Sequence, residues 1–276
     1  MKIEAVTVCV NYSDFLEHSI RYNKELFDKW VVVTDNKDTK TKELCDRTGV
    51  MCVQTDEFYR DGSTFAKYRG INEGLKHLDK DGWIVFMDGD ILLSPLTRRV
   101  FERKELQKHK MYGIDRLNCK GYERFVQFEQ SNPVIIDNWL LHGAGLEFGA
   151  RIVHIYGDES ENGRFTGWKP LGFFQMIHSS KLVDYPDHSP NASRGDLEFT
   201  KLWRMEDREL IPEIIGVHIY TEDYKGQNWG SRQSKPFTYE TPQPYLKRLY
   251  DKTGIRLNRY KYWLHMFIIH VIRTLR

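Results

Sequence analysis

Residues 83 to 95 read Trp83-Ile84-Val85-Phe86-Met87-Asp88-Gly89-Asp90-Ile91-Leu92-Leu93-Ser94-Pro95. The apolar run at the start of this stretch is rich in β-branched and aromatic residues, which predicts a strand buried on both faces. Two carboxylates, Asp88 and Asp90, follow that strand directly. Because open α/β sheets bind ligands beyond the carboxyl ends of their strands, the two acids are candidates for a functional site.

Asp88 and Asp90 are predicted to face one ligand, because Gly89 allows the backbone to turn tightly between them. Hard oxygen donors of this kind suit Mg²⁺ or Mn²⁺, and such a cation could neutralise a departing diphosphate. The alternative is an ordinary turn, since Asp-Gly is a common turn pair and Asp-x-Asp occurs by chance. The apolar stretches on both sides of the acid pair favour the metal site.

The composition bounds the class of protein. The chain has 276 residues, of which 40% are hydrophobic and 29% charged, which fits a soluble globular protein with one large α/β domain. No apolar run approaches the length needed to cross a bilayer, which argues against an integral membrane protein. The cysteines show no paired metal-binding spacing, and without a secretory leader we expect reduced thiols and a cytoplasmic location. They are Cys9, Cys45, Cys52 and Cys119.

The C-terminal end of the chain differs from the rest in charge. Residues 247–276 contain eight Lys or Arg and one Asp, although the formal net charge of the whole chain is only +2. We expect a domain over 1–245 and a basic amphipathic helical tail over 246–276. The tail can pack on the domain or on a second copy in a homodimer, contact an anionic membrane peripherally, or follow nucleic-acid phosphates. Its apolar face comprises Tyr260, Trp263, Leu264, Phe267, Ile268, Val271, Ile272 and Leu275.

Strand and helix patterns alternate through the first part of the chain. Strands are predicted at 3–10, 30–34 and 50–54, and helices at 39–47 and 63–78. This alternation predicts an α/β fold with a doubly wound, mostly parallel sheet and helices on both faces. The helix at 63–78 contains Gly70 and Gly74, which suggest close packing beneath a neighbouring strand.

The second part of the chain has a looser pattern. Between 111 and 168, short apolar stretches and Gly-rich turns suggest antiparallel strands and loops over a cleft. Further strands are predicted at 171–177 and 211–220, with a helix opening at Asp196 between them. No internal repeat and no low-complexity linker interrupts the sequence, so one domain is expected.

The order of these segments resembles GT-A-type nucleotide-sugar glycosyltransferases, especially family 2 and galactosyltransferase-like proteins. The resemblance covers roughly residues 3–232 and is most specific at Asp88-Gly89-Asp90 and at the Lys-x-x-x-x-Asn-x-Gly-Leu pattern of Lys67 to Leu75. It implies that Asp88 and Asp90 hold Mn²⁺ or Mg²⁺ with His218, and that the donor is a nucleoside diphosphate sugar, UDP-linked. The implied donor-binding residues are Val10, Asn11, Tyr12, Asp35, Lys67, Arg69, Asn72, Asp88, Gly172, Trp229 and Arg232.

Catalysis by inversion requires a base near the attacking hydroxyl, because the pKa of that hydroxyl lies far above neutrality. The resemblance implies Asp196 for this role, with Glu198 as the substitute. Structural alternatives stay open for most candidates: Asp35 or Asp196 as a helix cap, Lys67 and Arg69 as solvated charges, and His218 as a structural histidine.

The resemblance implies a metal-dependent glycosyltransferase, and its acceptor could be a glycan, a lipid-linked glycan or a modified nucleic acid. A GT-A-like domain that binds a nucleotide sugar or glycan without turnover is one alternative. A metal-dependent phosphotransferase with Asp88 as nucleophile is another. That alternative usually places its acid pair after the first strand, whereas here the pair follows the fourth.

Overall fold

The computed structural model describes residues 1–120, 158–159, 165–166, 170–187, 192 and 195–220. Its helices are α1 (Ser13–Asn23), α2 (Thr39–Thr48), α3 (Lys67–Leu75), α4 (Thr97–Arg103) and α6 (Gly195–Thr200). Short 3₁₀ helices are η1 (Lys24–Leu26), η2 (Glu57–Gly62), η3 (Ser179–Lys181) and η4 (Met205–Asp207). The predicted tail and the loop with Trp229 and Arg232 lie outside the described residues.

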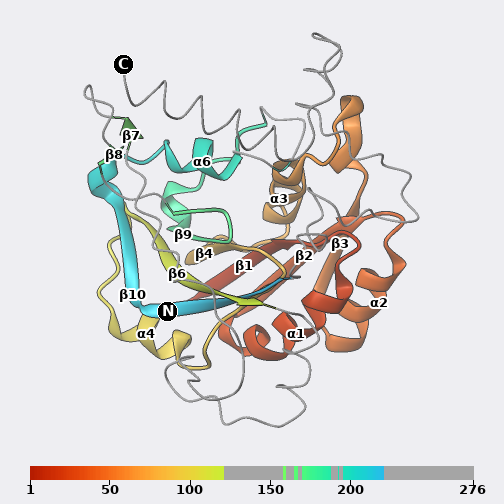
Figure 1. Ribbon diagram of the computed structural model, residues 1–276, viewed down its shortest axis with the longest axis horizontal. Coiled ribbons are helices and arrows are strands. Elements are labelled where there is room, and N and C mark those ends of the chain that lie inside the picture. Colours follow the sequence, from red (N-terminus) through yellow and green to blue (C-terminus); the bar gives the residue numbers. More distant parts are fainter. Residues whose placement is uncertain (121–157, 160–164, 167–169, 188–191, 193–194, 221–276) are drawn as a thin grey trace.

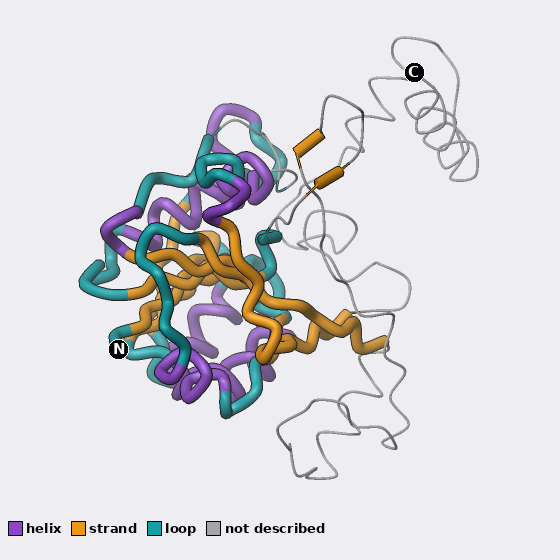
Figure 2. The backbone as a smooth tube through the Cα atoms, turned by 90° about the vertical axis from the view of Figure 1, so that its left-hand side faces the viewer, coloured by secondary structure: helices purple, strands orange, loops and turns teal. Residues whose placement is uncertain are grey.

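The strands form one large mixed sheet and a separate small hairpin (Figures 1 and 2). In the large sheet the spatial order is β3-β2-β1-β4-β9-β6-β10-β5. These strands are β1 (Ile3–Val8), β2 (Lys29–Asp35), β3 (Met51–Thr55), β4 (Trp83–Met87), β5 (Ile91–Leu92), β6 (Met111–Lys120), β9 (Phe174–His178) and β10 (Arg208–Tyr220). The hairpin pairs β7 (Asp158–Glu159) with β8 (Phe165–Thr166).

The sheet is mostly parallel, as the alternating pattern predicts. Strands β3, β2, β1 and β4 are parallel neighbours, and β6 is parallel to β10. Strand β9 runs antiparallel to β4 and β6, and β5 runs antiparallel to β10. The sheet thus changes direction at the β4–β9 pair, next to the acid pair.

Helices cover both faces of the sheet, which confirms that prediction. In Figure 1, α3 and α6 lie on one side, and α1, α2 and α4 lie on the other. Strand β1 supplies both faces by alternation, since Ile3 and Ala5 belong to one apolar cluster and Val6 and Val8 to the other. Within the described residues, no helix has the length and apolar character needed to span a membrane.

Strand β4 is the buried strand that the quoted stretch predicts. Each of its residues from Trp83 to Met87 is buried. It lies between β1 and β9 near the middle of the sheet, where both of its faces are covered. The acid pair therefore begins at the point where a rigid, central strand ends.

The glycines of α3 allow this helix to lie close to the sheet. A Cβ atom at Gly74 would come 2.6 Å from Cγ1 of Val6 and 2.8 Å from Cγ2 of Val33, and both valines are buried. A Cβ at Gly70 would collide with the ring of buried Phe58. The predicted close packing is confirmed, although the helix begins at Lys67 and not at Ser63.

We expect Gly74→Ala to lower the free energy of unfolding by about 1–2 kcal/mol, because overpacking exceeds the gain in helix propensity. Urea unfolding followed by circular dichroism measures this change. Lys76→Ala, an exposed change at the end of the same helix, should cost less than about 0.5 kcal/mol. An unchanged or higher stability of Gly74→Ala would show that α3 has room above β1 and β2.

Candidate active site

A cavity of about 340 Å³ lies at the carboxyl end of β4. Its walls come from β1, α3, the turn after β4, β6, the segment before β9, α6 and β10. Its charged and titratable lining residues include Lys67, Asp88, Asp90, Arg116, Asp196 and His218. The structure thus brings the predicted acid pair, base and histidine together in one cavity.

The backbone around the acid pair is fixed by buried side chains of α1. Ser19 donates its hydroxyl to the carbonyl of Gly89 at 2.8 Å. The Asn23 amide donates to the Ile91 carbonyl at 2.7 Å and accepts from the Leu93 amide at 2.8 Å. Both side chains are fully buried, so these bonds are shielded from water. The turn is therefore held in one conformation without relying on the acids themselves.

Asp88 is paired with Lys67, which projects from the first turn of α3. Burial opposes the charged form of Lys67, but the charge and hydrogen bond of Asp88, with the charges of Asp196 and Asp90, outweigh it and raise the pKa of the ammonium. Burial also raises the pKa of Asp88, against the attraction of Lys67 and with the repulsion of Asp90. Lys67 thus neutralises the acid pair from one side.

Asp90 is paired with His218, whose Nε2 lies 3.2 Å from Oδ2 of the carboxylate. Burial opposes the ionised form of Asp90, but the charge and hydrogen bond of His218, with Arg116 and Lys67, lower its pKa below the ordinary value. The other oxygen, Oδ1, is buried and has no hydrogen-bond partner among the described residues. Such an oxygen is costly to leave unpaired, so this atom is suited to accept a cation or a donor group from a ligand.

The donor set fits a divalent cation that binds together with a phosphate ligand. Among the described residues, no group of three or more His, Cys, Asp or Glu side chains forms a ready-made metal site. Mg²⁺ and similar ions, however, are often held by one or two carboxylates, with waters and substrate phosphates as the other ligands. The unpaired Oδ1 of Asp90 and the adjacent Asp88 supply such carboxylates.

Asp196 lies at the start of α6 and is positioned by glycines. Its Oδ2 accepts the backbone N–H of Gly172 at 2.8 Å. A Cβ atom on Gly172 would lie 2.7 Å from the Cβ of Asp196, so any larger residue would displace the acid. Gly195, directly before it, packs on the ring of Tyr68, where a Cβ would collide. Gly172, which the resemblance implies as a donor-binding residue, therefore sets the position of Asp196.

Glu198 lies in the same helix but is not among the residues that line the cavity. Its carboxylate pairs with Lys201 at 2.7 Å, and its side chain is 44% exposed. Of the candidate bases, only Asp196 lines the described cavity.

Gln175 connects this side of the cavity through a buried hydrogen-bond hub. Its Nε2 donates to the carbonyl oxygens of Pro170 and Asp196 and to Oγ1 of Thr200, and its Oε1 accepts the hydroxyl of Tyr185. Gln175 is fully buried and Tyr185 lines the cavity. The hub thus connects β9 with α6 and with the cavity wall at Tyr185.

Of the predicted donor-binding residues that follow β1 and end β2, some line the cavity and others do not. Tyr12 lines the cavity, whereas Val10 is fully buried in the core. Asn11 has a φ of 54° and donates its backbone N–H to Oδ2 of Asp38 at 2.6 Å. Asp35 is buried, accepts the amide of Lys37 and is not among the lining residues. Burial raises the pKa of Asp35.

The cap of α2 is Asp38 and not Asp35. Asp38 accepts the Thr41 amide at 3.1 Å, and its other oxygen accepts the hydroxyls of Thr41 and Thr34. The alternative interpretation of Asp35 as the helix cap is therefore wrong. Asp38 also holds the loop of Asn11, so one buried carboxylate orders the first two turns at this edge of the sheet.

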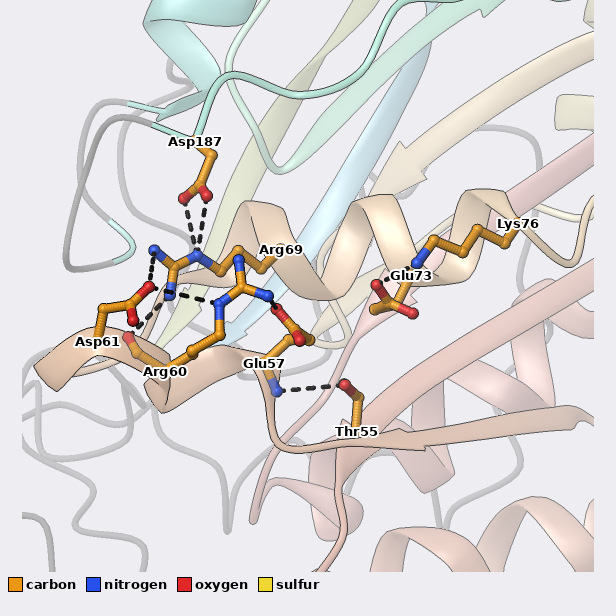
Figure 3. A network of polar contacts seen from close by, with 8 residues as sticks. All are labelled: Thr55, Glu57, Arg60, Asp61, Arg69, Glu73, Lys76 and Asp187. Carbon is orange, nitrogen blue, oxygen red and sulfur yellow. Dashed lines mark hydrogen bonds and ion pairs between the residues drawn. The ribbon is translucent and has the colours of Figure 1, made fainter.

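Arg69 and Asn72 make structural contacts on α3 and do not line the cavity. Arg69 pairs with Asp187 at 2.9 Å and donates to the carbonyl of Arg60, within the surface network drawn in Figure 3. The Asn72 amide bonds both the N–H and the carbonyl of Tyr185. These contacts fasten the segment that follows η3 to α3.

Arg116 of β6 lines the cavity but is not among the residues that the sequence pattern singles out. Its guanidinium carbon lies 4.6 Å from the centroid of the Phe173 ring. The sequence around Arg116 shows no clear strand or helix pattern, and the pairing of β6 with β9 and β10 places this arginine at the cavity. A lone arginine in such a strand offered no sequence signal of its own.

Several solved structures are similar to this chain. One is glucosyl-3-phosphoglycerate synthase from Mycobacterium tuberculosis, a GT-A-type enzyme, in complex with Mn²⁺, UDP and glucosyl-3-phosphoglycerate, at 12% identity and a TM-score of 0.46 over 79% of this chain and 71% of that chain. The same enzyme with Mn²⁺, UDP-glucose and phosphoglyceric acid matches with the same values. A further mycobacterial protein matches at 13% identity and a TM-score of 0.46, over 80% of this chain and 65% of that chain.

No protein-family model matches the chain, and no curated protein matches it in sequence. At these levels of identity and superposition, the structural likeness does not assign an activity to this chain.

The hub at Gln175 makes a prediction about coupled stability. Gln175→Leu leaves the buried hydroxyl of Tyr185 without its acceptor, and we expect a loss of about 2 kcal/mol or more. Tyr185→Phe in that background removes the stranded hydroxyl, so the double variant should be more stable than the sum of the single changes by about 1 kcal/mol. Chemical unfolding of the four proteins measures the cycle. Strictly additive effects would show that the two side chains do not depend on each other.

Proposed function

We propose that this protein is a metal-dependent glycosyltransferase that moves a sugar from a nucleoside diphosphate sugar to a hydroxyl acceptor. The observation that carries the proposal is the cavity in which Asp88, Asp90 and Asp196 converge with Lys67 and His218. Its two groups of acids suit two different tasks. The acid pair at the end of β4 suits a divalent cation that would bind the phosphates of the donor. The separate carboxylate on α6 suits the hydroxyl of the acceptor.

A divalent cation at Asp88 and Asp90, Mn²⁺ or Mg²⁺, supplies positive charge where the diphosphate leaves. Lys67 lies against Asp88 and can turn its ammonium toward a phosphate oxygen once that carboxylate has another partner. His218 holds Oδ2 of Asp90, so that Oδ1 stays directed to the ligand. Binding of the donor's diphosphate in this part of the cavity would therefore depend on a divalent metal.

Asp196 is the proposed base of the transfer. One of its oxygens is fixed by the Gly172 amide, which orients the carboxylate and leaves the other oxygen for the acceptor hydroxyl. The proton of that hydroxyl passes to Asp196 as the oxygen attacks the anomeric carbon, and the bond to the diphosphate breaks. Direct displacement of this kind inverts the anomeric configuration. The sequence resemblance supports a UDP-linked donor and an acceptor hydroxyl on a glycan, a lipid-linked glycan or a modified nucleic acid.

We expect transfer to fall about 100-fold or more in Asp90→Asn and in wild-type protein with excess EDTA, because the cation stabilises the leaving diphosphate by several kcal/mol. Calorimetric titration of UDP with and without Mn²⁺ should show metal-enhanced binding in the wild type but not in Asp90→Asn. Asp46→Asn, an acid on the exposed side of α2, is the control and should behave as the wild type. Full activity in EDTA would refute the metal dependence.

We expect Asp196→Asn to lower kcat about 100-fold or more while UDP binding stays within about twofold, because Asn keeps the bond to Gly172 but cannot take the proton. Glu198→Gln is the matched comparison on the same helix and should retain turnover. NMR of the product's anomeric proton should show inversion. Retention of configuration, or a larger loss in Glu198→Gln than in Asp196→Asn, would remove Asp196 from the role of base.

A further inference from the structure

Arg116 is a cation in the cavity without a protein anion bound to it. Within the part of the chain that the structure describes, its Nε atom is buried and has no hydrogen-bond partner, and no ion pair joins its guanidinium to a carboxylate. Asp88, Asp90 and Asp196 all lie within electrostatic reach of this side chain. Each of those acids, however, is bonded to another group: Lys67, His218 or the Gly172 amide.

The ring of Phe173 holds the guanidinium in place. The guanidinium carbon lies over the ring, 4.6 Å from its centroid, which is a favourable cation–π contact. Phe173 is itself fixed, since it is buried and its carbonyl accepts the amide of Asp88 at 3.2 Å. Arg116 is therefore held by the same segment that carries Gly172, within electrostatic reach of the acid pair and Asp196.

Burial of this cation is unfavourable without a ligand. Burial lowers the pKa of Arg116 below its ordinary value, and this effect is larger than the opposing attraction of the three acids. A bound oxyanion would replace the lost hydration with charge-assisted hydrogen bonds. A guanidinium is the side chain best suited to this, because its fork of donors matches two oxygens of a phosphate or carboxylate.

We propose that Arg116 binds an oxyanion of the substrate, a phosphate or a carboxylate, through its guanidinium fork. The assignment of that anion to a substrate rests on the function proposed above, whereas the anion site itself rests on the cavity alone. The oxyanion has two sources: the diphosphate of the donor, or an acid group on the acceptor. The ammonium of Lys67, in contrast, is already paired with the Asp88 carboxylate.

Isothermal titration calorimetry of the full chain at one fixed ionic strength tests the proposal. The probes are inorganic pyrophosphate with Mn²⁺, for the donor's diphosphate, and inorganic phosphate, for an acid group of the acceptor. We expect Arg116→Gln to weaken the binding of at least one probe about tenfold or more. Loss confined to pyrophosphate assigns the donor, and loss confined to phosphate assigns the acceptor.

Arg99→Gln, an exposed arginine of α4, is the matched control and should bind both probes as the wild type does. Arg116→Lys keeps the charge and should bind more tightly than Arg116→Gln but more weakly than the wild type. Thermal unfolding establishes that each variant is folded; if Arg116→Gln is not, the Lys variant carries the comparison. Equal affinities of the wild type and the Arg116 variant for both probes, or no binding of either probe by the wild type, would overturn the proposal.

The probes contain neither a nucleoside nor a sugar, so this test is independent of transfer. If anion binding depends on Arg116 but no nucleotide sugar is bound or turned over, the anion site stands and the glycosyltransferase proposal fails. If transfer occurs and neither probe responds to Arg116→Gln, the proposal for Arg116 fails alone.

Discussion

Strand β4 pairs in parallel with β1 on one side and antiparallel with β9 on the other, and these pairings set the residues that follow β4 beside those that precede β9. The antiparallel register sets Met87 opposite Phe174. The residues just before β9, Gly172 and Phe173, must therefore lie beside the residues just after β4. A parallel neighbour would have placed its far end there instead. The reversal of direction thus joins the acid pair to the segment that holds Asp196 and Arg116.

Charge in the cavity is balanced through local pairs. Lys67 neutralises Asp88 from above the sheet, on α3, and His218 approaches Asp90 from β10. Such pairs are costly to bury unless each member is well bonded. Among the described residues, Oδ1 of Asp90 and Nε of Arg116 are departures from this rule, because both atoms are buried without a hydrogen-bond partner. The first atom suits a cation or a donor group, and the second suits an acceptor.

The local sequence was sufficient to predict β4, the turn with Asp88 and Asp90, and the close packing of α3. Each of these features has its signal in residues that are near one another in the sequence. The local sequence was not sufficient to predict the role of Arg69. Its partner in a structural ion pair, Asp187, lies far away in the chain. Asp35 and Asp38 both suit a turn after β2, and only the geometry of the loop decides which carboxylate caps α2. Arg116 was missed for a related reason. Its strand has no clear pattern, and its place in the cavity follows from the pairing of that strand with β9 and β10.

The two sides of the cavity are supported by separate sets of contacts. The turn that carries Asp88 and Asp90 is held by Ser19 and Asn23 of α1, below the sheet. Asp196 is held above the sheet by Gln175 and by the close packing of Gly172 and Gly195. A change in one set can therefore alter one side while the other keeps its geometry. The proposed transfer requires a donor and an acceptor at a fixed separation, so under that proposal such a change would reduce turnover more than it reduces binding of either ligand alone. The separation of the two supports thus makes alignment, rather than affinity, the property most sensitive to substitutions outside the cavity.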